Sequence, residues 1–201
     1  MITNTRPYHH GALPSALLDA AQAELAEKGI EAFSLRGVAK RAGVSHAAPA
    51  HHFGDVQGLL TALAARGFER FVQRQQAFRR RAAPDARAQL LASGLGYVVF
   101  AEENPAIFRL MFGSNRPNFE DDALRRAAGA AYDDFVAHVA RARESHPPSA
   151  ADPDLMEAVA ATWAVAHGLA DLLVAGRLSS IAELAPKARR EAVLSVLARV
   201  V

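Results

Sequence analysis

Apolar residues recur at helical spacing along most of the chain, and the segment 34–43 carries the clearest short stripe. Its apolar side chains fall at i, i+3, i+4 and i+7, while its cations fall on other faces. Ser34 stands where an N-cap is expected, and Gly43 where a left-handed C-terminal turn suits a residue without Cβ. The pattern therefore predicts a short helix with both ends marked. The stripe consists of Leu35, Val38, Ala39 and Ala42.

A second short helix is predicted directly after this one. Ser45 is its N-cap candidate, and the helix ends before Gly54. It has almost no apolar mass, and small alanine side chains let a helix backbone approach base edges closely. Pro49 falls at about the fourth helical position, where it removes a backbone hydrogen bond to Ser45, so we expect a short or irregular helix. Phe53 is expected to anchor its far end in the core.

The rest of the chain also reads as helices. Asp55 is expected to cap a long helix that runs to about Arg81. Along it, Arg66, Arg70 and Arg74 form an i, i+4 stripe that we interpret as a solvated face. Further helices are predicted at about 86–103, 105–113, 119–145, 153–176 and 186–199, with breaks at prolines.

These patterns predict an all-α protein of about nine helices, because no alternating strand pattern occurs. Residues 1–54 form the expected helix-turn-helix domain of three helices, and residues 55–82 the connecting helix. Residues 83–201 form a larger helical domain for ligand binding and dimerisation. The turn around Pro84 is the expected boundary, although one continuous core could extend across it.

Composition agrees with this division. The net charge of +2 is uneven, since residues 1–82 carry 11 Lys and Arg against 6 Asp and Glu, whereas residues 83–201 carry 12 against 15. Five of the eight histidines lie in residues 1–53, so protonation below about pH 6.5 would add positive charge there. The chain has no cysteine, which excludes disulfides and thiolate metal sites. With neither a signal-peptide core nor an uninterrupted apolar run of about 18 residues, we expect a cytoplasmic protein without a membrane partner.

Three linked stretches carry a family resemblance. They are YHHGALPSALLDAA, GIEAFSLRGVAKRAGVS and HHFGDVQGLLTALA, between about Tyr8 and Phe68. Together they resemble the DNA-binding domain of the tetracycline-repressor (TetR) family of transcription regulators. The resemblance implies a recognition helix in the major groove of double-stranded operator DNA. The residues expected to contact DNA are Ser34, Arg36, Lys40, Ser45, His46, Ala47, Ala48, His51 and His52.

Two positions depart from the family pattern where the resemblance implies phosphate contacts. Ala50 stands in place of the usual Tyr, and Val56 in place of the usual Lys. Losing a hydroxyl donor and a cation should weaken the sequence-independent part of binding, by about one unit of salt slope for the cation.

The larger domain carries a dense group of aromatic residues. Trp163, His167 and Gly168 form a W-x-x-x-H-G pattern that is similar to the WHG-type effector domain of some TetR-like regulators. Aromatic stripes and a lone histidine are also typical of an ordinary core. Gly168 would allow a close helix crossing or leave room for a ligand. The residues expected to bind a small hydrophobic or aromatic effector are Tyr97, Phe100, Phe108, Met111, Phe112, Trp163 and His167.

The last helix has an apolar side formed by Ala192, Val193, Val196, Leu197 and Val200. This side could close the protomer's own core. The resemblance instead implies that the last two helices pack against their two-fold mates in a homodimer.

The function predicted from these residues is a ligand-responsive, homodimeric repressor that a small hydrophobic effector releases from a near-palindromic operator. The alternative is a ligand-sensing or protein-binding helical dimer with weakened or lost DNA recognition. We expect no enzyme and no cofactor, because the sequence has no G-x-S-x-G, P-loop, H-E-x-x-H or dinucleotide-binding turn. No metal site is expected at His51 and His52 either, since adjacent helical side chains diverge by about 100°.

Overall fold

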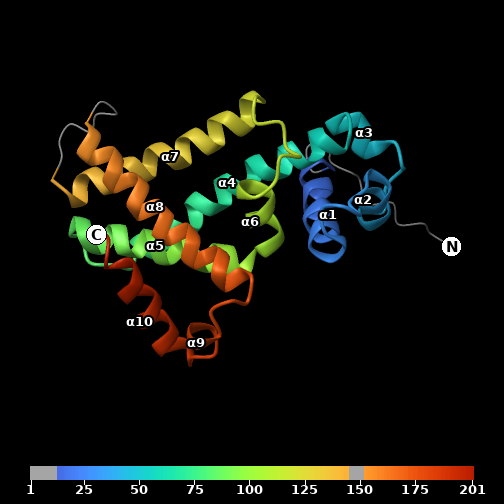
Figure 1. Cartoon of the computed structure of the whole chain (residues 1–201). Helices are drawn as coiled ribbons and strands as arrows, with labels where there is room; N and C mark the ends of the chain where they lie inside the picture. The colour runs from blue at the N-terminus through green and yellow to red at the C-terminus, as the bar shows by residue number, and fades with distance from the viewer. Residues whose placement is uncertain (1–12, 145–151) are drawn as a thin grey trace.

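The computed structural model describes residues 13–144 and 152–201, which form ten α-helices (Figure 1). The all-α prediction is confirmed, and the helix missed from the sequence is the four-residue α9. The first residues of the family resemblance, 8–12, lie outside the described ranges. The helices are α1 (Leu13–Lys28), α2 (Leu35–Ala42), α3 (Ala48–Phe53), α4 (Val56–Arg79), α5 (Ala86–Glu103), α6 (Pro105–Phe112), α7 (Asp122–Ala142), α8 (Pro153–Val174), α9 (Ser179–Ala182) and α10 (Pro186–Leu197).

Two of the predicted N-caps are confirmed, and one is wrong. The Ser34 hydroxyl accepts a hydrogen bond from the Gly37 amide at 3.1 Å, and Asp55 caps α4 in the same way. Ser45 does not cap α3, which begins three residues later at Ala48 without a side-chain cap. Pro49 explains the later start. A proline in the first turn of a helix costs no hydrogen bond, because backbone N–H groups there have no helical partner. At about the fourth position of a helix that began at Ser45, the same proline would remove a backbone hydrogen bond.

The long helix α4 connects the two ends of the molecule. Figure 1 shows it running from α3 into the larger group of helices, where it packs against α5, α6 and α7. One cluster of buried apolar side chains extends from Leu17 in α1 to Leu197 in α10. The core is therefore continuous across the turn at Pro84.

The arginine stripe of α4, expected to be a solvated face, is solvated only in part, because Arg70 is exposed whereas Arg66 and Arg74 are half-buried. Arg66 binds the Asp19 carboxylate at 2.7 Å, and Arg70 donates to Gln22 at 2.5 Å, so both side chains join α4 to α1. Arg74 pairs with Glu103 of α5. The spacing of the stripe was read correctly, but its partners lie far away in the sequence.

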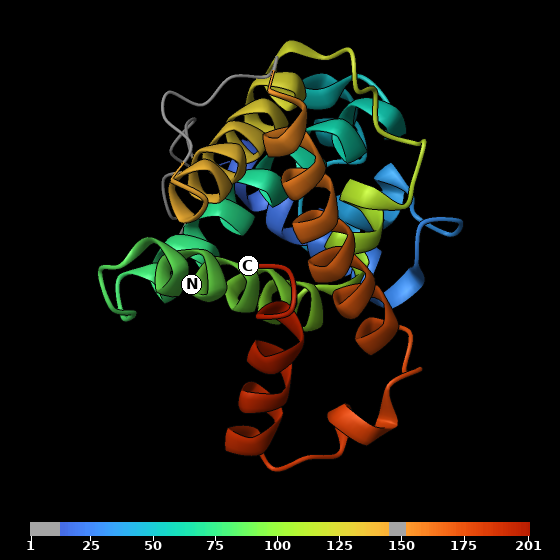
Figure 2. The ribbon, with the colours of Figure 1, turned by 60° about the vertical axis from the view of Figure 1, so that its left-hand side comes forward.

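Helices α8 and α10 are buried to different degrees. By length and composition α8 could cross a membrane, with a mean hydropathy of 1.3, although core helices of soluble proteins pass the same test. It packs against α5 and α7, yet only 33% of its most apolar window is buried. In α10, Val193 and Leu197 are buried in the protomer's own core. Figure 2 shows α9 and the start of α10 lying away from the other helices.

Candidate functional site

The residues expected to contact DNA lie mainly on one exposed surface. Of the six described residues of α3, Pro49 is buried, and Phe53 packs half-buried against the core. Ser34 and Ala48 are placed differently from the other candidates, because both are half-buried and the Ser34 hydroxyl is already engaged as a cap. The exposed candidates are Arg36, Lys40, Ser45, His46, Ala47, His51 and His52.

Arg41, the remaining cation of α2, is held inside this unit. Its guanidinium donates to the buried carboxylate of Glu24 at 3.1 Å and to Glu27. Hydrogen bonds from Lys28 and Arg41 lower the pKa of Glu27 to about 2, so this carboxylate stays ionised. A Cβ at Gly37 would come within 1.9 Å of a Glu24 oxygen, so the glycine makes room for the buried acid. Arg36 and Lys40 are thus the cations of α2 that remain available to phosphates.

The rings of His51 and His52 lie closer together than their adjacent positions predict. Their centroids are 5.3 Å apart in an edge-to-face arrangement. The expected divergence of about 100° applies to the Cβ directions and does not fix where the rings turn. Nevertheless, no cluster of three potential metal ligands occurs within residues 13–144 and 152–201.

The two departures from the family pattern occupy different environments. Ala50 is exposed on α3, where it offers a methyl group and no hydrogen-bond donor. Val56, the first residue of α4, is half-buried and packs against the core. Val56 therefore contributes packing at a position where a cation would contribute charge.

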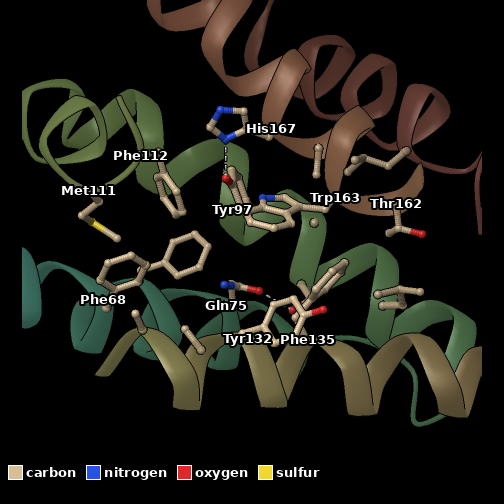
Figure 3. A pocket seen from close by; sticks show the side chains of 18 of the residues that line it. Phe68, Gln75, Tyr97, Met111, Phe112, Tyr132, Phe135, Thr162, Trp163 and His167 are labelled. Carbon is tan, nitrogen blue, oxygen red and sulfur yellow. Dashed lines mark hydrogen bonds between the residues drawn. The ribbon is translucent and has the colours of Figure 1, made fainter. Parts of the chain in front are cut away.

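A cavity of about 700 Å³ opens in the larger domain, between α4, α5, α6, α7 and α8 (Figure 3). Its walls are mainly aromatic and aliphatic. Among the described residues, no Asp, Glu, Lys or Arg side chain lines it. Such a shape and lining are typical of a site for a small apolar molecule.

The cavity brings together most of the residues expected to bind an effector, but two of these residues lie outside its lining. Phe100 and Phe108 do not line it and are each only 2% exposed. They pack behind the wall, where Phe100 meets Phe71 and Phe108 meets Tyr97. Apolar periodicity does not distinguish residues that line a cavity from residues packed behind them, because both kinds fall on the inward side of a helix. The predicted residues that do line the cavity are Tyr97, Met111, Phe112, Trp163 and His167.

Sequence reasoning missed the contribution of α4. Phe68, Phe71 and Gln75 lie one turn apart along this helix and face the cavity. The sequence feature that could have indicated this contribution is Gln75, a polar residue on an otherwise apolar stripe. Tyr132 and Phe135, members of the dense aromatic group that were not among the expected ligand-binding residues, also line the cavity. Other lining residues that were missed include Ser93, Ser114 and Thr162.

Tyr97 and His167 form a polar pair at one end of the cavity. The Tyr97 hydroxyl lies 2.7 Å from His167 Nδ1 (Figure 3). Burial raises the pKa of Tyr97 and lowers the pKa of His167, so the tyrosine keeps its proton and the imidazole is neutral. A neutral imidazole has one N–H, so the tautomer of His167 decides whether the hydroxyl donates to Nδ1 or accepts from it.

The other members of the W-x-x-x-H-G pattern have separate positions. Trp163 is 41% exposed at the edge of the cavity, with its ring 6.3 Å from that of Tyr132. Gly168 neither lines the cavity nor sits at a close helix crossing among the described residues, because an added Cβ would meet no atom within 4 Å. Both roles expected for Gly168 within one protomer are therefore wrong.

Comparisons with known families cover most of the chain. A family model described as bacterial regulatory proteins, tetR family, matches residues 17–63. A second model, described as tetracyclin repressor-like, C-terminal domain, matches residues 90–197. Comparison with curated proteins gives no match.

Several solved structures are similar over nearly their whole length. A protein with unknown function from Rhodococcus sp. RHA1 is 33% identical, with a TM-score of 0.79, and the match covers 98% of this chain and 97% of that one. A TetR-like transcriptional regulator from the same organism is 16% identical, with a TM-score of 0.64 over 96% and 97% of the two chains. The TetR family regulator PfmR from Thermus thermophilus is 19% identical, with a TM-score of 0.64 over 92% and 96%. The last two similarities show the fold alone.

Proposed function

This chain belongs to the tetracycline repressor (TetR) family of DNA-binding transcriptional regulators, and from that premise we propose that it is a homodimeric repressor. In this proposal it acts in the cytoplasm and leaves a near-palindromic operator when a small hydrophobic effector enters the cavity. The observation that carries the effector role is the 700 Å³ cavity without a charged side chain in its described lining. The W-x-x-x-H-G pattern would assign this domain to the WHG-type subset.

The operator-binding surface in this proposal is the exposed side of α3 together with α2. The recognition helix supplies His51 and His52, and α2 supplies the exposed cations Arg36 and Lys40. Cations and backbone amides near phosphates fix the register, whereas α3 and the turn before it would read base edges. The surface has few strong donors, so we expect moderate affinity with a clear salt dependence.

Helix α6 is the route by which an occupied cavity would affect DNA binding. Met111 and Phe112 of α6 line the cavity, and the same helix contacts α1 of the DNA-binding end. At Gly67, an added Cβ would lie only 2.7 Å from the Met111 sulfur, so α6 and α4 are in close contact. An effector that displaces Met111 would therefore shift both helices, by no more than its differential affinity for the two conformations.

The outer face of α8 supports the homodimer. Leu172 is 38% exposed, and Gly168 faces open space in the protomer. An apolar helix with two thirds of its window unburied has surface left for a partner. A two-fold arrangement of α8 and α10 would cover this face and present two α3 helices to half-sites about one DNA turn apart.

A mobility-shift experiment on the DNA upstream of the gene tests this function. We expect sequence-selective binding by a dimer, with affinity falling steeply between about 50 and 200 mM salt. An unrelated competitor should not displace the protein, and mixtures of apolar molecules should be screened for release. Weak, competitor-sensitive binding by a folded dimer would contradict the operator role and favour the alternative of a ligand-sensing dimer without DNA recognition.

A further inference from the structure

A chain of buried hydrogen bonds ends at the wall of the cavity. The Asp134 carboxylate of α7 accepts hydrogen bonds from Arg79 of α4 at 2.9 and 3.2 Å. Arg79 Nη1 also lies 3.0 Å from the Ser93 hydroxyl of α5, and that hydroxyl lies 2.7 Å from Gln75 Oε1. Arg79, Ser93 and Gln75 are each at least nine-tenths buried. Three helices therefore meet in one polar relay inside an apolar domain.

The relay has a fixed direction because a guanidinium can only donate. The Ser93 oxygen must accept from Arg79, so its single proton is left to donate to Gln75 Oε1. With its oxygen held in this way, the Gln75 amide turns its NH2 group to the other side. That nitrogen donates to no residue in the described part of the chain, and Gln75 lines the cavity (Figure 3). The cavity is thus offered a hydrogen-bond donor with a set orientation.

The backbone around Gln75 is packed closely enough to hold this orientation. A Cβ at Gly96 would lie 2.8 Å from the Gln75 Cα, so the glycine lets α5 approach α4 at this point. Ser93 stands one turn before Gly96 on the same helix and is brought into reach of the amide. The donor is therefore positioned by two helices that share the domain core.

The electrical character of the wall favours an uncharged ligand. The charges of Arg79 and Asp134 compensate each other in a two-bond pair. No charged side chain of the described residues lines the cavity, so a bound anion would lose its hydration and gain only neutral partners. The Gln75 amide has the opposite need, because its NH2 group borders the cavity and can donate a hydrogen bond to an uncharged acceptor.

We propose that the Gln75 amide is the recognition point for an uncharged carbonyl group carried by a flat apolar ligand. Phe68, Phe71 and Phe112 line the same cavity, with their rings in edge-to-face contact, and would hold the apolar body. The inference rests on the proposed function of the cavity as an effector site. It adds the chemical class of the effector, which includes aryl ketones, esters and lactones.

Three probes of nearly equal shape test the proposal. They are 2-acetylnaphthalene, its alkene isostere 2-isopropenylnaphthalene, and the anion 2-naphthoate. Dissociation constants are measured by equilibrium dialysis against the full-length protein. We expect the ketone to bind about three- to tenfold more tightly than the alkene, as one net hydrogen bond provides. The anion should bind most weakly.

Two variants and a control locate the effect. Gln75→Met has a similar shape without the donor, and Gln75→Glu keeps an acceptor for Ser93 without offering an N–H. Both should remove the preference for the ketone, and thermal unfolding identifies a variant that fails to fold. Gln73→Met is the matched control, because this glutamine lies on the exposed side of the same helix and does not line the cavity. Its preference should equal that of the wild type.

Equal binding of ketone and alkene by the wild type would overturn the inference and leave the cavity as an effector site without this donor. A ketone preference that persists in both Gln75 variants would also overturn it. Tightest binding of 2-naphthoate would contradict the uncharged class. If none of the three probes bound, both the inference and the effector role would be contradicted, while operator binding would remain a separate measurement.

Discussion

The DNA-binding end and the cavity of this protein place their polar groups in opposite ways. On α2 and α3 most polar side chains are outside, apart from Arg41, and the start of α2 is fixed by the bond between Ser34 and Gly37, three positions apart. Around the cavity the polar side chains are inside, and Arg79 meets a partner 55 residues away at Asp134. Within α1 to α3 the bond from Arg41 to Glu24 spans 17 residues, whereas the relay beside the cavity joins residues 55 positions apart.

This difference predicts how each region responds to substitution. An exposed cation on α2 contributes to DNA affinity and little to the free energy of unfolding. A buried member of the relay contributes to the fold and to the shape of the cavity at once. Substitutions on α2 should therefore change DNA affinity alone, whereas substitutions in the relay should change both ligand affinity and stability.

The largest effect is expected for Asp134→Ala. It leaves the guanidinium of Arg79, whose side chain is 9% exposed, without its carboxylate. An uncompensated buried charge costs about 3 kcal/mol in the free energy of unfolding, which urea denaturation measures. Glu103→Ala is the control, because the Arg74–Glu103 pair is more exposed and should contribute less than about 1 kcal/mol. Equal losses of unfolding free energy in the two variants would show that the buried pair contributes no more to stability than the exposed pair.

The next effect is expected when the cavity is filled. Ala128 lines it from α7, and a phenylalanine there would occupy space that a ligand needs. For Ala128→Phe we expect at least tenfold weaker binding of 2-acetylnaphthalene by equilibrium dialysis, with operator affinity unchanged. Ala130→Phe places the same ring on the exposed side of α7 and should alter neither quantity. Reduced operator affinity in Ala128→Phe alone would show that the cavity shape, rather than the ligand, sets the DNA-binding conformation.

The sequence predicted the DNA-binding end more accurately than the cavity, because short-range contacts can be read from neighbouring residues and long-range contacts cannot. The ends of α2 follow from Ser34 and Gly43, which act on neighbours a few residues away. Even there, Ser45 was misread, because a proline can begin a helix as well as interrupt one. The cavity wall and the layer behind it have the same apolar periodicity, so Phe108 could not be told from Phe112. Gln75 and Ser93 gain their meaning only when α4 and α5 lie side by side.

At the DNA-binding end, charge changes should alter salt dependence and leave ligand binding unchanged. Arg36→Gln and Lys40→Gln should each reduce the slope of log affinity against log salt by about two units for the dimer, if each side chain contacts one phosphate in each subunit. Val56→Lys should raise the slope by about two units in the same way, since a lysine stem can cover the core while its ammonium reaches out. Mobility shifts at four salt concentrations measure these slopes. An unchanged slope for Val56→Lys would show that the start of α4 does not approach the backbone of DNA.

The smallest effect concerns pH and the buried histidines of the larger domain. Burial is the main cause that lowers the pKa of His138, and the nearby guanidinium of Arg79 acts in the same direction. The unfolded chain binds a proton on this residue near pH 6.5, whereas the folded protein resists it, so stability is present above that pH and is lost as the pH falls. Between pH 7.5 and 5.5 we expect a loss of less than about 1 kcal/mol in the free energy of unfolding from this group. Urea denaturation of His138→Gln at both pH values should show a smaller loss, because glutamine cannot titrate and can still donate to the Asp134 carbonyl that His138 contacts at 2.7 Å. An equal loss in His138→Gln and in the wild type would show that the acid sensitivity belongs to another group.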